Sequence, residues 1–220
     1  MSLGTFQKIQ ANGQMASFER LRHGAANMGL GQHIGAMANI IAAESGWNPH
    51  AQNPNSSAGG LAQFIDSTWS QYGGGNKFDP MQQIANFLQF TADNIQSFVS
   101  NVGRQPDAAE IYASHFGGAG VGNALGKMLD SGQGHLPISS VLSSEQIAAN
   151  SGIEFNGKSF SQLTVGEFHD WAASKADPDG TANQVAEAGR GLQGVRDSEQ
   201  STSHIPQLTA AREHSGGRSA

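Results

Sequence analysis

The sequence contains no cysteine, which excludes disulfides and thiolate metal sites. It also lacks a continuous apolar run of about eighteen residues, the length that a membrane-spanning helix requires. Basic residues are few, since 12 Lys and Arg stand against 18 Asp and Glu and give a formal net charge of -6 at pH 7. Binding to a phosphate backbone needs clustered Lys and Arg, so sequence-specific nucleic-acid binding is excluded as the main function. The N-terminal stretch MSLGTFQKIQ has no apolar core of a signal peptide.

One carboxylate stands at an unusual place in the helical pattern. Apolar residues recur at the spacing of one helical face, at Ile34, Met37, Ala38 and Ile41. Glu44 continues this row, and the sequence SGWNP that follows is typical of a helix end. We therefore expect Glu44 at the edge of a cleft, where partial removal from water favours the proton of a general acid. Judged from this helix alone, an ordinary surface glutamate is the alternative.

Four short motifs follow one another within about thirty residues. Any one of them alone would carry little information, but their occurrence together and in order indicates a protein family. They are Glu44-Ser45, then Asn48-Pro49 with Ala51, then Gly60-Leu61-Ala62-Gln63, then Thr68-Trp69. Together they resemble the catalytic core of the soluble lytic transglycosylases, which have a goose-lysozyme-like fold. Ala62 departs from the family pattern, which usually has methionine there.

The resemblance implies an enzyme that acts on peptidoglycan glycan strands without a metal or cofactor. In this reading Glu44 protonates the bond between N-acetylmuramic acid and N-acetylglucosamine, and Ser45 orients the acid. Gly60, Leu61 and Gln63 would position the N-acetyl groups. Asp66 is the other acid in the motif region, and we interpret it as a helix N-cap, so the substrate's own 6-hydroxyl would close a 1,6-anhydro ring. The alternatives are a hydrolase of the same fold and a structural protein that has lost activity.

A second candidate region lies in the sequence EIYASHFGGAG, residues 110–120. It resembles a variant found in phage-encoded transglycosylases. Either Tyr112 or His115 could donate a hydrogen bond to Glu44 or to sugar, and the sequence leaves this open. A histidine that only packs between helices is the alternative for His115.

The pattern predicts a mainly α-helical protein in four parts. Residues 1–32 form an N-terminal arm, over residues 1–13, and a helix; residues 33–132 form the lysozyme-like core. Residues 133–176 form a small helical extension, and residues 177–220 form a tail too poor in large apolar groups to build a core of its own. In the core we expect a flexible break at Gly73, Gly74 and Gly75, followed by a long helix from Pro80 with Asp79 as its N-cap and an apolar stripe that includes Ile84, Phe87 and Phe98. In the extension, Thr164 with Glu167 three residues later predicts a capping box. A calcium loop near Asp177 is rejected, because the pattern lacks the required later Glu.

The expected setting is a phage particle. Residues 146–176 resemble a segment of phage structural proteins, and a wall-cleaving enzyme without a signal peptide needs assisted release, dedicated secretion or carriage in a particle. We expect a virion component that opens the host wall during genome ejection and acts in the periplasm or cell wall. Its partners would be peptidoglycan and other virion proteins, which would hold the tail.

Overall fold

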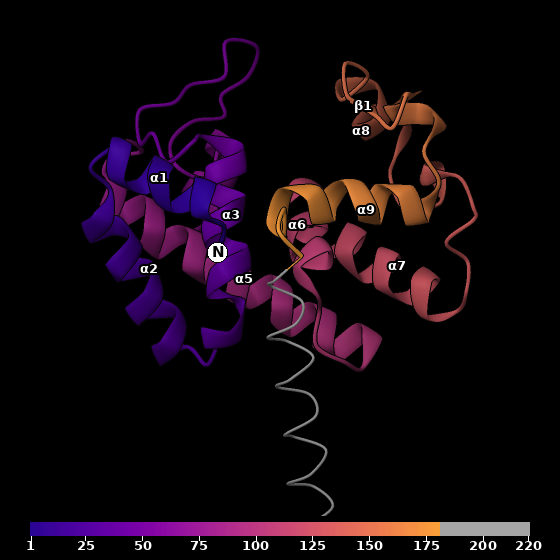
Figure 1. The fold of residues 1–220 in the computed structure, drawn as a ribbon, viewed down its shortest axis with the longest axis horizontal. Coiled ribbons are helices and arrows are strands. Elements are labelled where there is room, and N and C mark those ends of the chain that lie inside the picture. Colours follow the sequence, from indigo (N-terminus) through magenta and orange to yellow (C-terminus); the bar gives the residue numbers. More distant parts are fainter. Residues whose placement is uncertain (181–220) are drawn as a thin grey trace, which may run out of the picture. The chain divides into compact units, whose positions relative to one another are not determined.

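The computed structural model describes residues 1–180, and the expectation for most of the tail falls on residues 181–220, outside this range. Helices dominate, as the sequence predicts (Figure 1). The longer helices are α1 (Leu3–Ala11), α2 (Met15–Asn27), α3 (Ile34–Glu44), α5 (Pro80–Val102), α6 (Ala108–Gly117), α7 (Ala119–Asp130) and α9 (Val165–Ala176). The short elements are η1 (Gly31–His33), α4 (Asp66–Gln71), η2 (Ile138–Ser140), α8 (Ser144–Ala149), β1 (Glu154–Phe155), β2 (Lys158–Ser159) and η3 (Phe160–Gln162).

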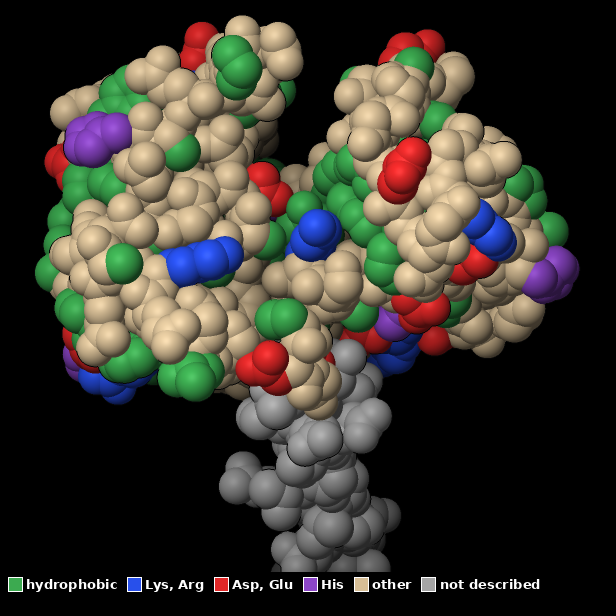
Figure 2. Space-filling model, turned by 45° about the horizontal axis from the view of Figure 1, so that its top comes forward, with side chains coloured by type: hydrophobic (Ala, Val, Ile, Leu, Met, Phe, Trp, Pro, Cys, Tyr) green, Lys and Arg blue, Asp and Glu red, His purple; other side chains and the backbone are tan. Residues whose placement is uncertain are grey.

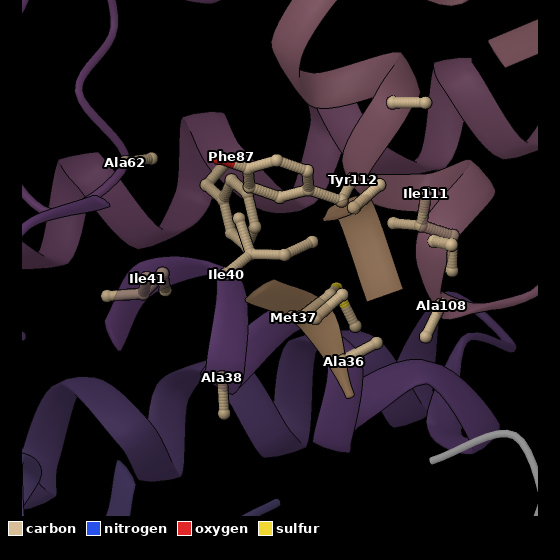
Figure 3. Close-up of a cluster of buried hydrophobic side chains, with 14 of the residues drawn as sticks. Ala36, Met37, Ala38, Ile40, Ile41, Ala62, Phe87, Ala108, Ile111 and Tyr112 are labelled. Atoms are coloured by element: carbon tan, nitrogen blue, oxygen red, sulfur yellow. The ribbon is translucent and has the colours of Figure 1, made fainter. Parts of the chain in front are cut away.

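Helix α3 lies at the centre of the described fold. It contacts α1, α2, α6 and α9, and residues 36–42 are all buried. A helix that is apolar nearly all round is stable only when other elements cover it, which explains the central position of this segment. Its side chains Met37 and Ile40 point toward Phe87 and Tyr112 of the neighbouring helices (Figure 3). The catalytic candidate at the end of α3 is therefore carried by the most enclosed helix.

Helix α5 crosses the molecule and packs on α2 near its start and on α6 and α7 farther along (Figure 1). The predicted cap is confirmed: the Asp79 carboxylate accepts a hydrogen bond from the Met81 N–H at 2.8 Å, and Pro80 is the first helical residue. The predicted apolar stripe, which includes Ile84, Phe87 and Phe98, is buried.

The glycine-rich stretch over residues 117–122 joins α6 to α7, and α7 already begins at Ala119 and contains two of these glycines. A Cβ on Gly122 would lie 1.9 Å from Ser114 Oγ, so glycine is needed there for α6 and α7 to approach closely. At this position glycine therefore serves helix packing.

The prediction of an N-terminal arm over residues 1–13 is wrong, because residues 3–11 form helix α1. Ser2 caps this helix by accepting a hydrogen bond from the Thr5 N–H at 3.0 Å, and Ile9 is buried. Asn39 of α3 ties the chain start to α9, since its Oδ1 accepts from Ser2 N at 3.1 Å and its Nδ2 donates to the Ala176 carbonyl at 2.9 Å. Sequence periodicity did not reveal α1 because it has few apolar residues, and a buried polar residue on another helix anchors it.

The expected helical extension is built into the same hydrophobic core as the helices before it. The predicted capping box at its last helix is confirmed, with Thr164 Oγ1 accepting from the Glu167 N–H at 3.2 Å. Helix α9 packs along α6, where Trp171 meets Tyr112 edge to face with ring centroids 5.5 Å apart. The short hairpin of β1 and β2 pairs Glu154 with Ser159. The extension therefore supports the helix that carries the second group of site candidates.

Candidate active site

Glu44 is the last residue of α3, and its side chain is 21% exposed. The chain turns sharply after it, because Gly46 and Trp47 both have positive φ, of 63° and 66°. Trp47 is fully buried, and its indole N–H donates to the Ala38 carbonyl at 3.1 Å. This anchor folds the chain back along the helix and holds the Glu44 carboxylate at the rim. The sequence analysis gave Trp47 no role, although a tryptophan directly after the helix-ending glycine was a usable signal.

His115 of α6 faces the Glu44 carboxylate, with Nε2 3.9 Å from Oε1. Its ring stacks on Phe64 at a centroid distance of 6.0 Å and meets Phe87 and Phe90 edge to face at 5.7 and 5.8 Å. Burial in this aromatic surround lowers the pKa of His115, against the opposing effect of the Glu44 charge. The imidazole is therefore neutral near pH 7. Its buried Nδ1 has no hydrogen-bond partner in the described part of the chain, so Nε2 is the atom turned to the acid.

Tyr112 stands one helical turn before His115 and also meets Glu44. Burial, and then the charge and hydrogen bond of Glu44, raise the pKa of the Tyr112 phenol well above its usual range, so the hydroxyl keeps its proton and donates to the carboxylate. The sequence left open which of the two residues reaches the acid. The structure brings both of them to it.

The Gly60–Gln63 turn forms one wall beside the acid, but three of its four residues, Gly60, Leu61 and Ala62, are buried. The backbone N–H of Leu61 donates to Gln83 Oε1 at 2.9 Å, and the Leu61 side chain is fully buried. Gly60 has a φ of 78°, and a Cβ there would lie 2.6 Å from Gln83 Nε2. The expectation that these two residues contact the N-acetyl groups is therefore corrected: Gly60 and Leu61 shape the wall from within.

Gln63 lies at the surface of this turn with a φ of 50°. Its side-chain Nε2 donates to the carbonyls of Gly60, at 2.9 Å, and Ala51, at 3.3 Å. The amide nitrogen thus closes the loop over residues 51–60, and the side chain borders the cavity described below. Gln83, which the sequence analysis did not single out, fixes the same loop from beneath through Nε2 bonds to the carbonyls of Pro49, at 2.9 Å, and Lys77, at 2.6 Å.

Two further expectations are corrected by hydrogen bonds. Ser45 Oγ donates to the Ile41 carbonyl at 3.2 Å, so this side chain closes the last turn of α3, and the expected bond to the acid is not the one formed. Asp66 is the first residue of α4, whose N-cap is Ile65. The Asp66 carboxylate, 75% exposed, instead accepts a hydrogen bond from Lys77 Nζ at 2.7 Å.

A cavity of about 300 Å³ opens beside His115. Its aromatic wall includes Phe64, Phe90 and Phe116, and its polar wall includes Gln63, Thr68 and Gln146. The residues that line it, all within the described chain, include no Asp or Glu. Figure 2 shows the surface hollowed between the two halves of the described fold, with an acidic side chain on the wall of the hollow. An aromatic and amide-lined space next to a lone acid suits an uncharged sugar ring.

The family comparison agrees with this geometry. Residues 28–121 match the family model of the transglycosylase SLT domain. This part of the chain therefore resembles the lysozyme-like lytic transglycosylases. Members of this family cleave glycosidic bonds, and Glu44, Gln63, Tyr112 and His115 all lie within the matched range. No curated protein matches this chain.

The matched range of residues 28–121 does not include helices α1, α2, α8 and α9 or most of α7, and these elements pack around the matched part. Among residues 1–180, no helix is long and apolar enough to cross a membrane. No group of three or more His, Asp or Glu side chains in the same range is placed to hold a metal ion.

Proposed function

We propose that the enzyme cleaves the β-1,4 bond between N-acetylmuramic acid and N-acetylglucosamine in peptidoglycan, with Glu44 as acid and then as base. The observation that carries this proposal is the pairing of one rim carboxylate with two buried, uncharged partners. Tyr112 and neutral His115 hold the carboxylate in place, and neither competes for its proton as a Lys or Arg would. Such a carboxylate can alternate between its two protonation states during the reaction.

The proposed reaction has two proton transfers through the same residue. Glu44 gives its proton to the glycosidic oxygen, so that the bond from this oxygen to C1 of the muramic acid breaks and N-acetylglucosamine leaves with a free 4-hydroxyl. The Glu44 carboxylate then takes the proton of the muramyl 6-hydroxyl while this oxygen bonds to C1. The product is a 1,6-anhydro ring, water is not consumed, and Glu44 ends protonated as it began.

The choice of an internal nucleophile rests on the absence of a second carboxylate. Glycosidases that hydrolyse their substrates commonly place a second carboxylate about 5–9 Å from the first to act as nucleophile or to activate water. In the described chain the cavity beside His115, which faces Glu44, has no such lining residue, and Asp66 is engaged with Lys77. Gln63 and the aromatic wall then have the task of holding the sugar so that its 6-hydroxyl faces C1.

Mass spectrometry of fragments released from purified peptidoglycan tests this function. The wild-type protein should release fragments that end in 1,6-anhydromuramic acid, and Glu44→Gln should release none. Glu145→Gln is a matched control, because Glu145 is a fully exposed residue of α8 and its loss should leave the products unchanged. Reducing-end products would assign the chain as a hydrolase. No release by folded wild-type protein would favour a structural role.

We further propose that the transglycosylase works as part of a phage particle and opens the host wall during genome ejection. Support comes from the sequence of residues 110–120, in which His115 and Phe116 occupy the segment as in phage-encoded relatives, and from the phage-like segment over residues 146–176. Peptide mass spectrometry on purified particles, set against lysate from which particles were removed, tests this setting. Peptides found only in the particle-free fraction would contradict it.

A further inference from the structure

A second recess lies on the other side of the end of α3, and it differs in charge from the aromatic cavity. It has a volume of about 550 Å³ and lies between the start of the chain, α3 and the end of α9. We call it the lysine groove; its lining includes Thr5, Lys8, Ala43, Ser174, Lys175 and Asp179. Two cationic side chains and one anionic side chain thus border a recess in a chain whose overall net charge is -6.

The two lysines are held in place by different contacts. Lys8 Nζ donates to the Ala42 carbonyl at 3.0 Å, which uses one of its three donors and fixes the ammonium near the end of α3. Lys175 Nζ lies over the Trp171 ring, 5.8 Å from its centroid, and has no ion-pair partner among residues 1–180. Both ammonium groups therefore keep hydrogen-bond donors for a ligand.

The lysine groove and the acid share the C-terminal end of helix α3. Ala43, on its wall, directly precedes Glu44. Lys175 covers Trp171, Trp171 packs on Tyr112, and Tyr112 donates to Glu44, so two aromatic rings link this lysine to the carboxylate. Figure 2 shows a basic side chain close below the acidic one in the hollow between the two halves.

We propose that the lysine groove binds the carboxylate-bearing stem peptide of peptidoglycan. This inference rests on the proposed function, since the stem peptide branches from the same muramic acid whose C1 reacts at Glu44 and so must leave the site close to the acid. Of the two recesses, the aromatic cavity has no Lys or Arg in its described lining, whereas the lysine groove offers two ammonium groups. The elements that supply these lysines, α1 and α9, lie outside the matched family range.

Calorimetric binding of two synthetic probes to the full chain tests the proposal. The probes are a muramyl tripeptide on N-acetylglucosamine with free peptide carboxylates, and the same compound with those carboxylates amidated. Wild type should bind the free-carboxylate probe about fivefold more tightly, as expected for a partly exposed ion pair. Lys175→Gln should bind both probes alike, and Lys127→Gln, which removes an exposed lysine on α7, should keep the preference.

Equal binding of both probes by wild type, or a preference that survives in Lys175→Gln, would overturn the proposal. Lys8→Gln gives a second arm, and its thermal unfolding shows whether loss of the bond to Ala42 has disturbed α3. Binding and cleavage are separate readouts. If wild type prefers the free carboxylates but releases no anhydro products from peptidoglycan, the groove assignment stands and the proposed reaction fails.

Discussion

Two histidine–carboxylate pairs each include one residue of α6 or its N-cap. They differ in the distance between their charged groups and in the direction of the histidine pKa shift. His169 Nε2 lies 3.0 Å from Asp107 Oδ2, within hydrogen-bond distance, whereas His115 Nε2 lies 3.9 Å from Glu44 Oε1. Burial opposes the charge on His169, but the hydrogen bond and charge of Asp107 raise its pKa; burial lowers the pKa of His115. The contacts of the first pair favour its ionised, hydrogen-bonded form, whereas burial favours a neutral imidazole in the second.

The Asp107 pair belongs to a larger ionic network that fastens three helices. Arg104 donates to both oxygens of the fully buried Glu110, at 2.7 and 2.6 Å, and also to Asp130 of α7. Asp107 caps α6 and reaches His169 of α9. Every carboxylate in this network is occupied by fixed donors. Glu44 has no Lys or Arg within ion-pair distance among residues 1–180, so the comparison separates a carboxylate used for structure from one left available for chemistry.

The largest expected effect contrasts the two carboxylates directly. Glu44→Gln should lower the cleavage rate by about 10³-fold or more, because the general acid is lost, and should change the free energy of unfolding little. Asp107→Asn keeps the N-cap of α6 but removes the charge that faces His169, so it should lower stability and spare the rate. Anhydromuropeptide release and urea unfolding of both variants check this contrast. A large loss of stability in Glu44→Gln would show that Glu44 also has a structural role and would contradict the contrast with Asp107.

A smaller effect is expected from His115→Phe. The new ring suits the aromatic surround of Phe64, Phe87 and Phe90 and removes a buried nitrogen without a partner, so stability should hold or rise. The rate should fall by about tenfold to a hundredfold, because the acid loses the neighbour that positions it. The effect should appear in kcat rather than KM, and steady-state kinetics on a soluble glycan would show it. An unchanged kcat would show that His115 only packs between helices and does not position the acid.

The smallest expected effect concerns pH and the His169 pair. Because the folded-state pKa of His169 is raised above its usual value of 6.5, its stabilisation is fully present below that value and is lost as pH rises through the raised pKa. For Asp107, burial opposes ionisation but the hydrogen bond and charge of His169 lower the pKa, so its contribution disappears at low pH. His169→Asn should therefore cost about 1 kcal/mol near pH 5 and less at pH 9, a modest figure because the pair is partly solvent-exposed. Urea unfolding of wild type and variant across this range measures the difference, and a cost that does not change with pH would contradict it.

His115 should behave in the opposite sense. Its lowered pKa means that the unfolded chain binds a proton more readily than the folded one as pH falls below 6.5, so this residue reduces stability on acidification. Comparing wild type with His115→Phe in the same unfolding series isolates this contribution. If acidification changed the stability contributions of His115 and His169 in the same direction, the contrast between the two pairs would be contradicted.

The sequence predicted the helices that have strong local signals and the acid at the end of one of them. Two helix caps could be predicted from a few neighbouring residues, and both were confirmed: Asp79 before Pro80, and Thr164 with Glu167. Helix α1 and the start of α7 were missed, because one is held by Asn39 from another helix and the other uses glycine for close packing. Local patterns cannot reveal such partners, which lie far away in the chain.

The same limit applies within the candidate site. Glu44, Tyr112 and His115 could be named from their motifs, but their meeting depends on how α3, α6 and α9 pack. Ser45, Gly60 and Leu61 were assigned substrate or acid contacts, whereas their hydrogen bonds and burial give them structural roles. Gln83 has three backbone partners from separate loops, so its importance became visible only in three dimensions.

The central claim is that one carboxylate works with a nucleophile that the substrate supplies. Cleavage of peptidoglycan in water enriched with heavy oxygen, followed by mass spectrometry of the released muramic acid ends, tests it most directly. The account predicts 1,6-anhydro ends that carry no heavy oxygen at C1, because the 6-hydroxyl of the same sugar closes the ring. Heavy oxygen at C1 of the fragments, with a free reducing end, would contradict it and would require a water-activating carboxylate, which the lining of the cavity beside His115 does not include among residues 1–180.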